Sequence, residues 1–212
     1  MTTARYRFTT VGDGDLAVGS DGVAGRRRAV VDLPWTWLRQ EHGAGVVVAR
    51  RPGEGAGRRA DAVVTAAPGA AVAVQVADCA PVALLAAGAV GAVHVGWRGL
   101  LAGVVPAAVA ALRALDGGPA RAVVGPCIGP ECYEFGADDL DRVVAAVGPA
   151  ARSLTAAGRP ALDLRASVVA ALAAAGVAEV AVEGGCTACG GPWWSHRARG
   201  DRSRQAVVAW LA

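Results

Sequence analysis

Hydrophobic positions in the first half of the chain fall in short segments that favour β-strands. Short runs rich in valine and alanine are separated by glycine, proline and aspartate, which are the residues that end strands and form turns. The pattern predicts strands over residues 5–9, 35–40, 46–49, 62–65, 71–76, 82–86 and 90–95. The intervening segments 11–25 and 50–59 are rich in glycine and polar residues. We expect them to be loops.

In the second half the apolar period lengthens to that of helices. It predicts helices over 100–115, 138–147 and 164–175, and strands over 120–124, 177–182 and 205–210. Pro106 should either kink the first of these helices or mark its first turn. Strands and helices do not alternate strictly, and no Gly-x-Gly-x-x-Gly turn opens a helix. The expected architecture is therefore α+β, a single domain over residues 1–212 with a mixed β-sheet flanked by helices.

The segment 79–97 has no charged residue and approaches the roughly 20 residues that span a bilayer. It is interrupted by Pro81 and by glycines, however, and is composed mainly of alanine and valine. Two buried strands joined by a turn at residues 87–88 explain it better. The first ten residues alternate polar and apolar positions and form no apolar core of a signal peptide. We expect a cytoplasmic protein without a membrane partner.

Composition excludes some chemistry. The chain has no lysine, so a lysine nucleophile or Schiff base is ruled out. The net charge is +3, and the arginines lack the aromatic interleaving of a single-strand-binding groove. We therefore expect no nucleic-acid partner.

Candidate metal ligands stand out because histidine is scarce. Two of the three histidines, His42 and His94, lie beside or near glycine at expected strand ends. Cys79, in the string Asp78-Cys79-Ala80-Pro81, occupies an expected turn between two buried strands. Two histidines and a cysteine match a catalytic zinc site, which uses three protein ligands and leaves a fourth position open.

The remaining cysteines are less informative. Five cysteines in a cytoplasmic chain indicate thiolate chemistry, metal binding or burial rather than disulfides. Cys186 and Cys189 have the spacing of half a zinc knuckle, but no second pair stands near them, and Cys127 and Cys132 are spaced differently. We interpret Cys186 and Cys189 as packed or inactive thiols whose replacement leaves the metal content unchanged.

Arg98 is a candidate anion ligand. It follows Gly96-Trp97 and precedes an expected helix start, so its guanidinium and free backbone N–H groups can converge on a phosphate. The competing interpretation is a surface arginine paired with a carboxylate.

Several strings, taken in order, resemble one family, the laccase-domain proteins, which have been called multicopper polyphenol oxidase, peptidoglycan editing factor and purine nucleoside phosphorylase. The strings are LRQEHG at 38–43, ADCAPV at 77–82, AVHVGWRG at 92–99, GPCIGP at 125–130 with YE at 133–134, and CT to SHR between 186 and 197. The chain departs from the family's usual pattern at its amino end, where Thr9-Thr10 is followed by Val11 and the segment to His42 is short.

The resemblance implies an α+β fold shared with cysteine-hydrolase-like toxins and a zinc ion held by His42, Cys79 and His94. It also implies phosphorolysis of adenosine, inosine and methylthioadenosine, with adenosine deamination alongside. The leading hypothesis is therefore a zinc-dependent purine nucleoside enzyme whose small-molecule substrates are the nucleoside and phosphate, with phosphate at Arg98. Asp78 would orient a ligand or shuttle a proton.

Other functions remain open. The same residues would serve a cysteine-type hydrolase that edits a peptidoglycan precursor, with Cys79 as nucleophile and His94 as base. A copper-dependent polyphenol oxidase fits less well, because a trinuclear copper cluster needs many imidazoles and the chain has three histidines and one methionine. Copper at the single site stays possible, as does a non-catalytic binding module. The sequence leaves the oligomeric state open.

Overall fold

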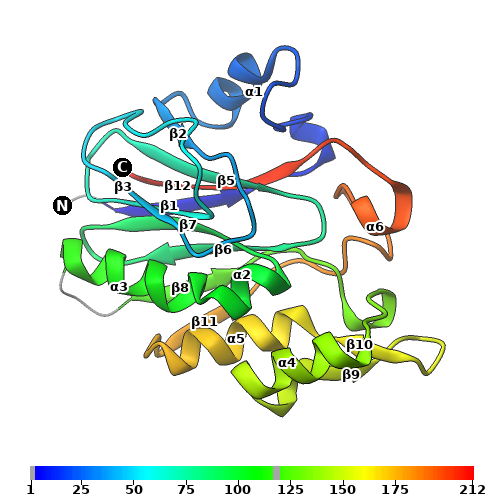
Figure 1. Ribbon diagram of the computed structural model, residues 1–212. Helices are drawn as coiled ribbons and strands as arrows, with labels where there is room; N and C mark the ends of the chain where they lie inside the picture. Colours follow the sequence, from blue (N-terminus) through cyan, green and yellow to red (C-terminus); the bar gives the residue numbers. More distant parts are fainter. Residues whose placement is uncertain (1–2, 117–119) are drawn as a thin grey trace.

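Two mixed β-sheets face each other at the centre of the molecule (Figure 1). The computed structural model describes residues 3–116 and 120–212. One sheet has the order β1-β12-β5-β2 and the other the order β11-β8-β6-β7-β4-β3. The strands are β1 Ala4–Phe8, β2 Trp35–Trp37, β3 Val46–Ala49, β4 Ala62–Thr65, β5 Ala71–Val76, β6 Ala80–Leu85, β7 Val90–Val95, β8 Arg121–Val124, β11 Glu179–Val182 and β12 Gln205–Leu211.

Helices cover the outer face of the six-stranded sheet, and one short helix lies on the other side of the molecule (Figure 1). The larger group, α2 to α5, lies on the six-stranded sheet, whereas α1 lies beside the four-stranded sheet. A small hairpin of β9 and β10 lies near α4. The bounds are α1 Val23–Val30, α2 Trp97–Ala102, α3 Val104–Asp116, α4 Ala137–Val147, α5 Leu164–Ala174, α6 His196–Arg199, β9 Arg152–Leu154 and β10 Pro160–Leu162.

Alternation along the buried strands supplies two apolar layers at once. In β6, Val82 and Leu84 pack toward the helices, while Ala83 and Leu85 pack toward the other sheet. This is why the strand is apolar at every position and shows no polar face in the sequence. Small side chains keep the two sheets close, so the segments at the sheet ends are held on a rigid base.

The predicted α+β class with mixed strands is confirmed, and every predicted strand is present, four of them with the predicted bounds and the others with shifted ends. The single mixed sheet of the prediction is in fact two mixed sheets. The expected helix over 100–115 is two helices, because Gly103 adopts a left-handed conformation with φ of 86° and separates α2 from α3. Pro106 lies in the first turn of α3, where its missing N–H costs no helical hydrogen bond.

Several short elements escaped prediction, α6 among them. Helix α1 begins at Val23, inside the expected loop 11–25, and that loop also holds a 3-10 turn at Val11–Asp13. Three arginines and a glycine give α1 no apolar period, so the sequence carried little helical signal. Strands β9 and β10 have three residues each, which is too short for a period to be recognised.

The uncharged segment 79–97 forms β6 and β7, joined by a turn, as expected. Among the described residues, every helix is too short or too polar to cross a membrane.

Candidate active site

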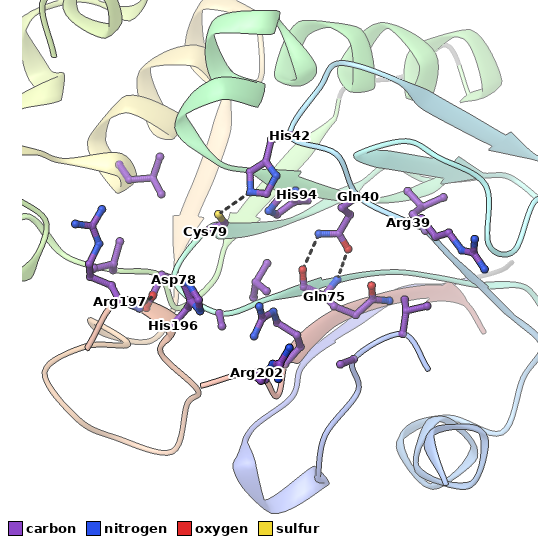
Figure 2. A pocket seen from close by; sticks show the side chains of 18 of the residues that line it. Arg39, Gln40, His42, Gln75, Asp78, Cys79, His94, His196, Arg197 and Arg202 are labelled. Carbon is purple, nitrogen blue, oxygen red and sulfur yellow. Dashed lines mark hydrogen bonds between the residues drawn. The ribbon is translucent and has the colours of Figure 1, made fainter. Parts of the chain in front are cut away.

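His42, Cys79 and His94 come together at one end of the six-stranded sheet (Figure 2). Their candidate ligand atoms all lie within 4.8 Å of one another, and the Cys79 Sγ is 3.9 Å from the His42 Nε2. The two imidazole rings meet edge to face with centroids 4.8 Å apart. His94 is buried, Cys79 is half-buried and His42 is exposed. One side of the cluster therefore faces the protein interior, and the other side is accessible to solvent.

Strand register explains why Cys79 and His94 meet. Strands β6 and β7 are antiparallel, with Pro81 opposite His94 and Ala80 opposite Val95. Cys79, one residue before β6, therefore lies next to Gly96, one residue after β7. A Cβ atom on Gly96 would lie 2.9 Å from the His42 ring and 3.1 Å from the Cys79 Sγ. Glycine is needed there because any side chain would intrude on the cluster.

Asp61 holds the cluster in place, and the sequence analysis missed it. Its fully buried carboxylate accepts hydrogen bonds from the backbone N–H groups of His42 at 2.9 Å and Gly43 at 2.8 Å. It also lies 2.8 Å from the Nδ1 of His94. An Nδ1–H bound to a carboxylate leaves the Nε2 lone pair of His94 free for a metal ion. His42, which has a positive φ of 59°, is held in that conformation by the same carboxylate.

Cys79 and His94 form a charged pair at neutral pH. Burial raises the pKa of Cys79, but the neighbouring imidazoles of His94 and His42 outweigh it and lower the pKa to about 6. Burial lowers the pKa of His94, whereas the charge of Cys79 and the hydrogen bond to Asp61 raise it to about 9. The thiol is therefore ionised at neutral pH, which is the form that binds metals and attacks electrophiles.

In metal-free protein, the alkylation rate of Cys79 is expected to rise with pH through a midpoint near 6, because only the thiolate reacts. Cys189, whose pKa is raised by its contacts with Cys132 and Glu131, should react only at alkaline pH. Iodoacetamide labelling at a series of pH values, followed by peptide mass spectrometry, measures both. A Cys79 midpoint no lower than that of Cys189 would contradict the charged pair.

A cavity of about 670 Å³ contains the cluster in its wall, a size typical of small-molecule sites. Apolar side chains and cations both line it (Figure 2). The apolar group includes Leu38, Val76, Ile128 and Leu164, and the arginines are Arg39, Arg197, Arg202 and Arg204. The cavity thus offers an apolar wall and several arginines beside one candidate metal centre.

Asp78 lines the cavity, but both of its carboxylate oxygens are engaged. One accepts a hydrogen bond from the hydroxyl of Thr187 and the other from the backbone N–H of Arg197, each at 2.6 Å. Asp78 therefore ties the turn before Cys79 to the segment that carries Arg197. In this arrangement it positions neighbouring residues.

Arg98 is not among the residues that line the cavity. Its exposed guanidinium lies 4.4 Å from the centre of the Trp97 ring, at the start of the short helix α2. Arg197 does line the cavity, and its guanidinium lies 5.2 Å from the ring centre of Tyr133. Sequence position alone gave no signal for Arg197, because α6, which carries it, is remote in the chain from His42, Cys79 and His94.

The three clustered residues fit a zinc ion by donor chemistry and by space. Two imidazoles and a thiolate are a known catalytic zinc set, Asp61 fixes one imidazole from behind, and Gly96 leaves room beside the sulfur. Binding would displace the proton of His94, as metal binding generally does.

Comparison with known proteins is consistent with these motifs. A family model described as multi-copper polyphenol oxidoreductase laccase matches residues 9–212. The chain is 42% identical over 207 residues to a purine nucleoside phosphorylase of Streptomyces coelicolor, covering 95% of this chain and 85% of the relative. It is 36% identical over 209 residues to a purine nucleoside phosphorylase of Mycobacterium tuberculosis, covering 95% and 82%.

Solved structures share the fold. Neisseria meningitidis protein NMB0706 superposes with a TM-score of 0.84 and 28% identity, over 100% of this chain and 98% of that one. YlmD from Geobacillus stearothermophilus gives a TM-score of 0.86 and 25% identity, over 98% and 92%. With a family match that runs from residue 9 to residue 212, the chain belongs to the laccase-like multi-copper polyphenol oxidoreductase family.

Proposed function

We propose that this chain is a zinc-dependent purine nucleoside phosphorylase with adenosine deaminase activity, acting as one catalytic domain over residues 1–212 in the cytoplasm. The observation that carries the proposal is the cluster of His42, Cys79 and His94 in the wall of a cavity with apolar and cationic sides. The names of its relatives supply the substrate class: proteins up to 42% identical are called purine nucleoside phosphorylases.

The cavity accounts for the two kinds of substrate. A nucleoside has a flat apolar base, which suits the side of the cavity formed by Leu38, Val76 and Ile128. Phosphate carries negative charge, which suits the arginine side. A zinc ion held by His42, Cys79 and His94 would supply a Lewis acid for the polar atoms of the substrate. Asp61 keeps the imidazole of His94 oriented toward that centre.

Phosphate binding by Arg98, as the sequence analysis predicts, stays a prediction. The lining of the cavity favours Arg197 as the phosphate ligand, because its guanidinium lies in the wall and is held over Tyr133. Arg202 and Arg204 line the same cavity. We therefore place the phosphate on the side of these three arginines.

The test is phosphate-dependent release of hypoxanthine from inosine. Arg197→Lys keeps the charge but loses the two-pronged hydrogen bond, and should weaken phosphate use by about 1–3 kcal/mol, the range for a charge-assisted hydrogen bond. Adenosine deamination should change less, because phosphate does not take part in it. Arg98→Lys is the matched comparison and should leave phosphate use unchanged. If phosphate use falls in the Arg98 variant instead, the phosphate site is to be assigned to Arg98. No phosphate dependence in the wild type would refute phosphorolysis.

One observation favours a second candidate, the cysteine-type hydrolase acting on a peptidoglycan precursor. Cys79 has a pKa of about 6 and a buried imidazole partner, which is what a nucleophilic cysteine needs. The fold relation to cysteine-hydrolase-like toxins, which the family resemblance predicts, would support this candidate. The two proposals separate on inhibition: chelators should stop a zinc enzyme, whereas a hydrolase should resist chelators and be stopped by alkylation even in excess metal.

Copper at the same three residues is the alternative to zinc, because imidazole and thiolate also bind copper. Elemental analysis of purified protein distinguishes the two metals. A multicopper oxidase is disfavoured by the total of three histidines.

A further inference from the structure

A second group of potential metal ligands lies on two neighbouring loops. Glu131, Cys132, Cys186 and Cys189 each offer one ligand atom, and these atoms all lie within 4.8 Å of one another. None of the four lines the active-site cavity. The sequence analysis found no potential ligands near Cys186 and Cys189. The structure places Cys132 beside them, a proximity that the spacing along the chain does not reveal.

Sheet topology brings the two loops together. Strands β8 and β11 are parallel neighbours, with Val124 beside Val182 at their ends. The loops that follow them leave the same edge of the sheet and stay in contact through a bridge between Cys127 and Cys186. Glu131 and Cys132 come from the first loop, Cys186 and Cys189 from the second. Ligands contributed by two separate loops are typical of structural zinc sites.

The distances are close to those of a tetrahedral site. The Sγ atoms of Cys132 and Cys189 are 3.2 Å apart, and the Sγ of Cys189 is 3.2 Å from a carboxylate oxygen of Glu131. Sulfurs bound to one zinc ion at about 2.3 Å are separated by about 3.8 Å. Shifts of a few tenths of an ångström, at partly exposed side chains, would therefore admit an ion.

The backbone around the group also suits thiolate ligands. The N–H of Gly129 donates to the Sγ of Cys186 at 3.1 Å, a contact that stabilises the charged form of sulfur. A Cβ atom on Gly129 would collide with the Glu131 carboxylate, so glycine lets that carboxylate fold back over the loop. Gly190, directly after Cys189, has a positive φ of 126°, which lets the chain turn sharply after the ligand.

A partly buried cation, Arg165, lies near the group. The Nε and Nη2 atoms of Arg165 are buried without a hydrogen bond. Burial raises the pKa of Glu131, but hydrogen bonds from its own backbone, Cys189 and Cys186, and the charge of Arg165, lower it. A zinc ion with three thiolates and a carboxylate carries a net charge of about −2. Arg165 would compensate part of that charge.

We propose that Glu131, Cys132, Cys186 and Cys189 bind a second, structural zinc ion, with release of the thiol protons of the three cysteines. This ion fastens together two loops that also build the active-site cavity. Tyr133, next to Cys132, lines the cavity. Thr187, next to Cys186, donates its hydroxyl hydrogen bond to Asp78. The site itself takes no part in the reaction and does not depend on the proposed function.

The test is metal stoichiometry in protein loaded with zinc and freed of excess by gel filtration. Wild type should hold about two zinc ions per chain and Cys132→Ser/Cys189→Ser about one, because one site remains in the double variant. His42→Ala should also hold about one ion, and the combined variant none. Cys127→Ala, which removes a buried thiol outside the group, is the matched control and should keep both ions.

Cobalt substitution identifies the ligands and guards against misfolded variants. Cobalt-loaded His42→Ala protein should show strong thiolate-to-metal charge-transfer absorption from the second site, and adding Cys132→Ser/Cys189→Ser should remove it. If the serine variants do not fold, X-ray absorption of the zinc-loaded His42→Ala protein decides, since a sulfur-rich shell is expected.

Three results would overturn the proposal: wild type with about one zinc ion that His42→Ala removes completely, a zinc shell without several sulfurs, or a Cys132–Cys189 disulfide in freshly purified protein. Failure of the nucleoside assays would not affect these readouts.

Discussion

Alanine in place of His42, Cys79 or His94 is expected to remove the zinc ion proposed for the active site and to abolish the proposed phosphorolysis of inosine. These residues supply all the ligands of the cluster, and a site reduced from three ligands to two cannot hold the ion. Loss of Lewis-acid catalysis is worth several kcal/mol, or a fall in kcat/KM of about 10³-fold or more. Inosine phosphorolysis and zinc content measured on the same samples test both effects.

Two comparisons make this result specific. Each single variant should lose about one zinc ion and keep the ion proposed at the second site. Cys127→Ala removes a buried thiol outside both groups and should retain activity and both ions. Full zinc occupancy in all three alanine variants would refute the site, and full activity without zinc in any of them would refute the metal mechanism.

The sequence was sufficient for the strands of the two large sheets and for the three clustered residues because both leave local signals. The strands carry apolar runs bounded by turn residues, and His42, Cys79 and His94 are scarce residue types beside turns. Partners defined by long-range packing left no such signal. Asp61 is one aspartate among many in the sequence, and its role appears only when β4 lies beside β7.

The same reason explains why the sequence carried no signal for the positions of Cys132 and Arg197 in the fold. Cys132 approaches Cys189 because β8 and β11 are parallel neighbours, a pairing of strands far apart in the chain. Arg197 reaches the cavity because its backbone N–H donates a hydrogen bond to the carboxylate of Asp78, a residue far from it in the sequence. Arg98, by contrast, had a suggestive local context, but the folded chain stacks it on Trp97 at the surface. The local sequence context predicts the chemistry of a residue better than it predicts the surroundings of its side chain in the folded protein.

Asp61→Asn is expected to lower the affinity for the active-site zinc by about 10–100-fold, the range for residues that orient metal ligands. The carboxylate accepts at once from the backbone of His42 and Gly43 and from the Nδ1 of His94. An asparagine offers one acceptor oxygen and an NH₂ group, which would face N–H donors and cannot accept from them. His94 would then lose its fixed orientation, and the turn that carries His42 would loosen.

The variant should also be less stable, because a buried group that satisfied several donors is replaced by one that cannot. Removing one partner of a buried ion pair costs about 3–5 kcal/mol, and Asp61→Ala should approach that value in urea unfolding of metal-free protein. Asp163→Asn is the matched control. Asp163 accepts from the backbone N–H of Ala166 as the N-cap of α5, a task that asparagine performs equally well.

Added zinc separates the two effects of the Asp61 change. If Asp61 acts by orienting His94, excess zinc should restore phosphorolysis in Asp61→Asn while the loss in unfolding free energy of the metal-free protein remains. Zinc titration with an activity readout, beside urea unfolding, measures both quantities. Wild-type zinc affinity in Asp61→Asn would show that His94 is held by the sheet alone, through its backbone N–H to the carbonyl of residue 61 at 2.8 Å, and that the carboxylate serves only the turn at His42.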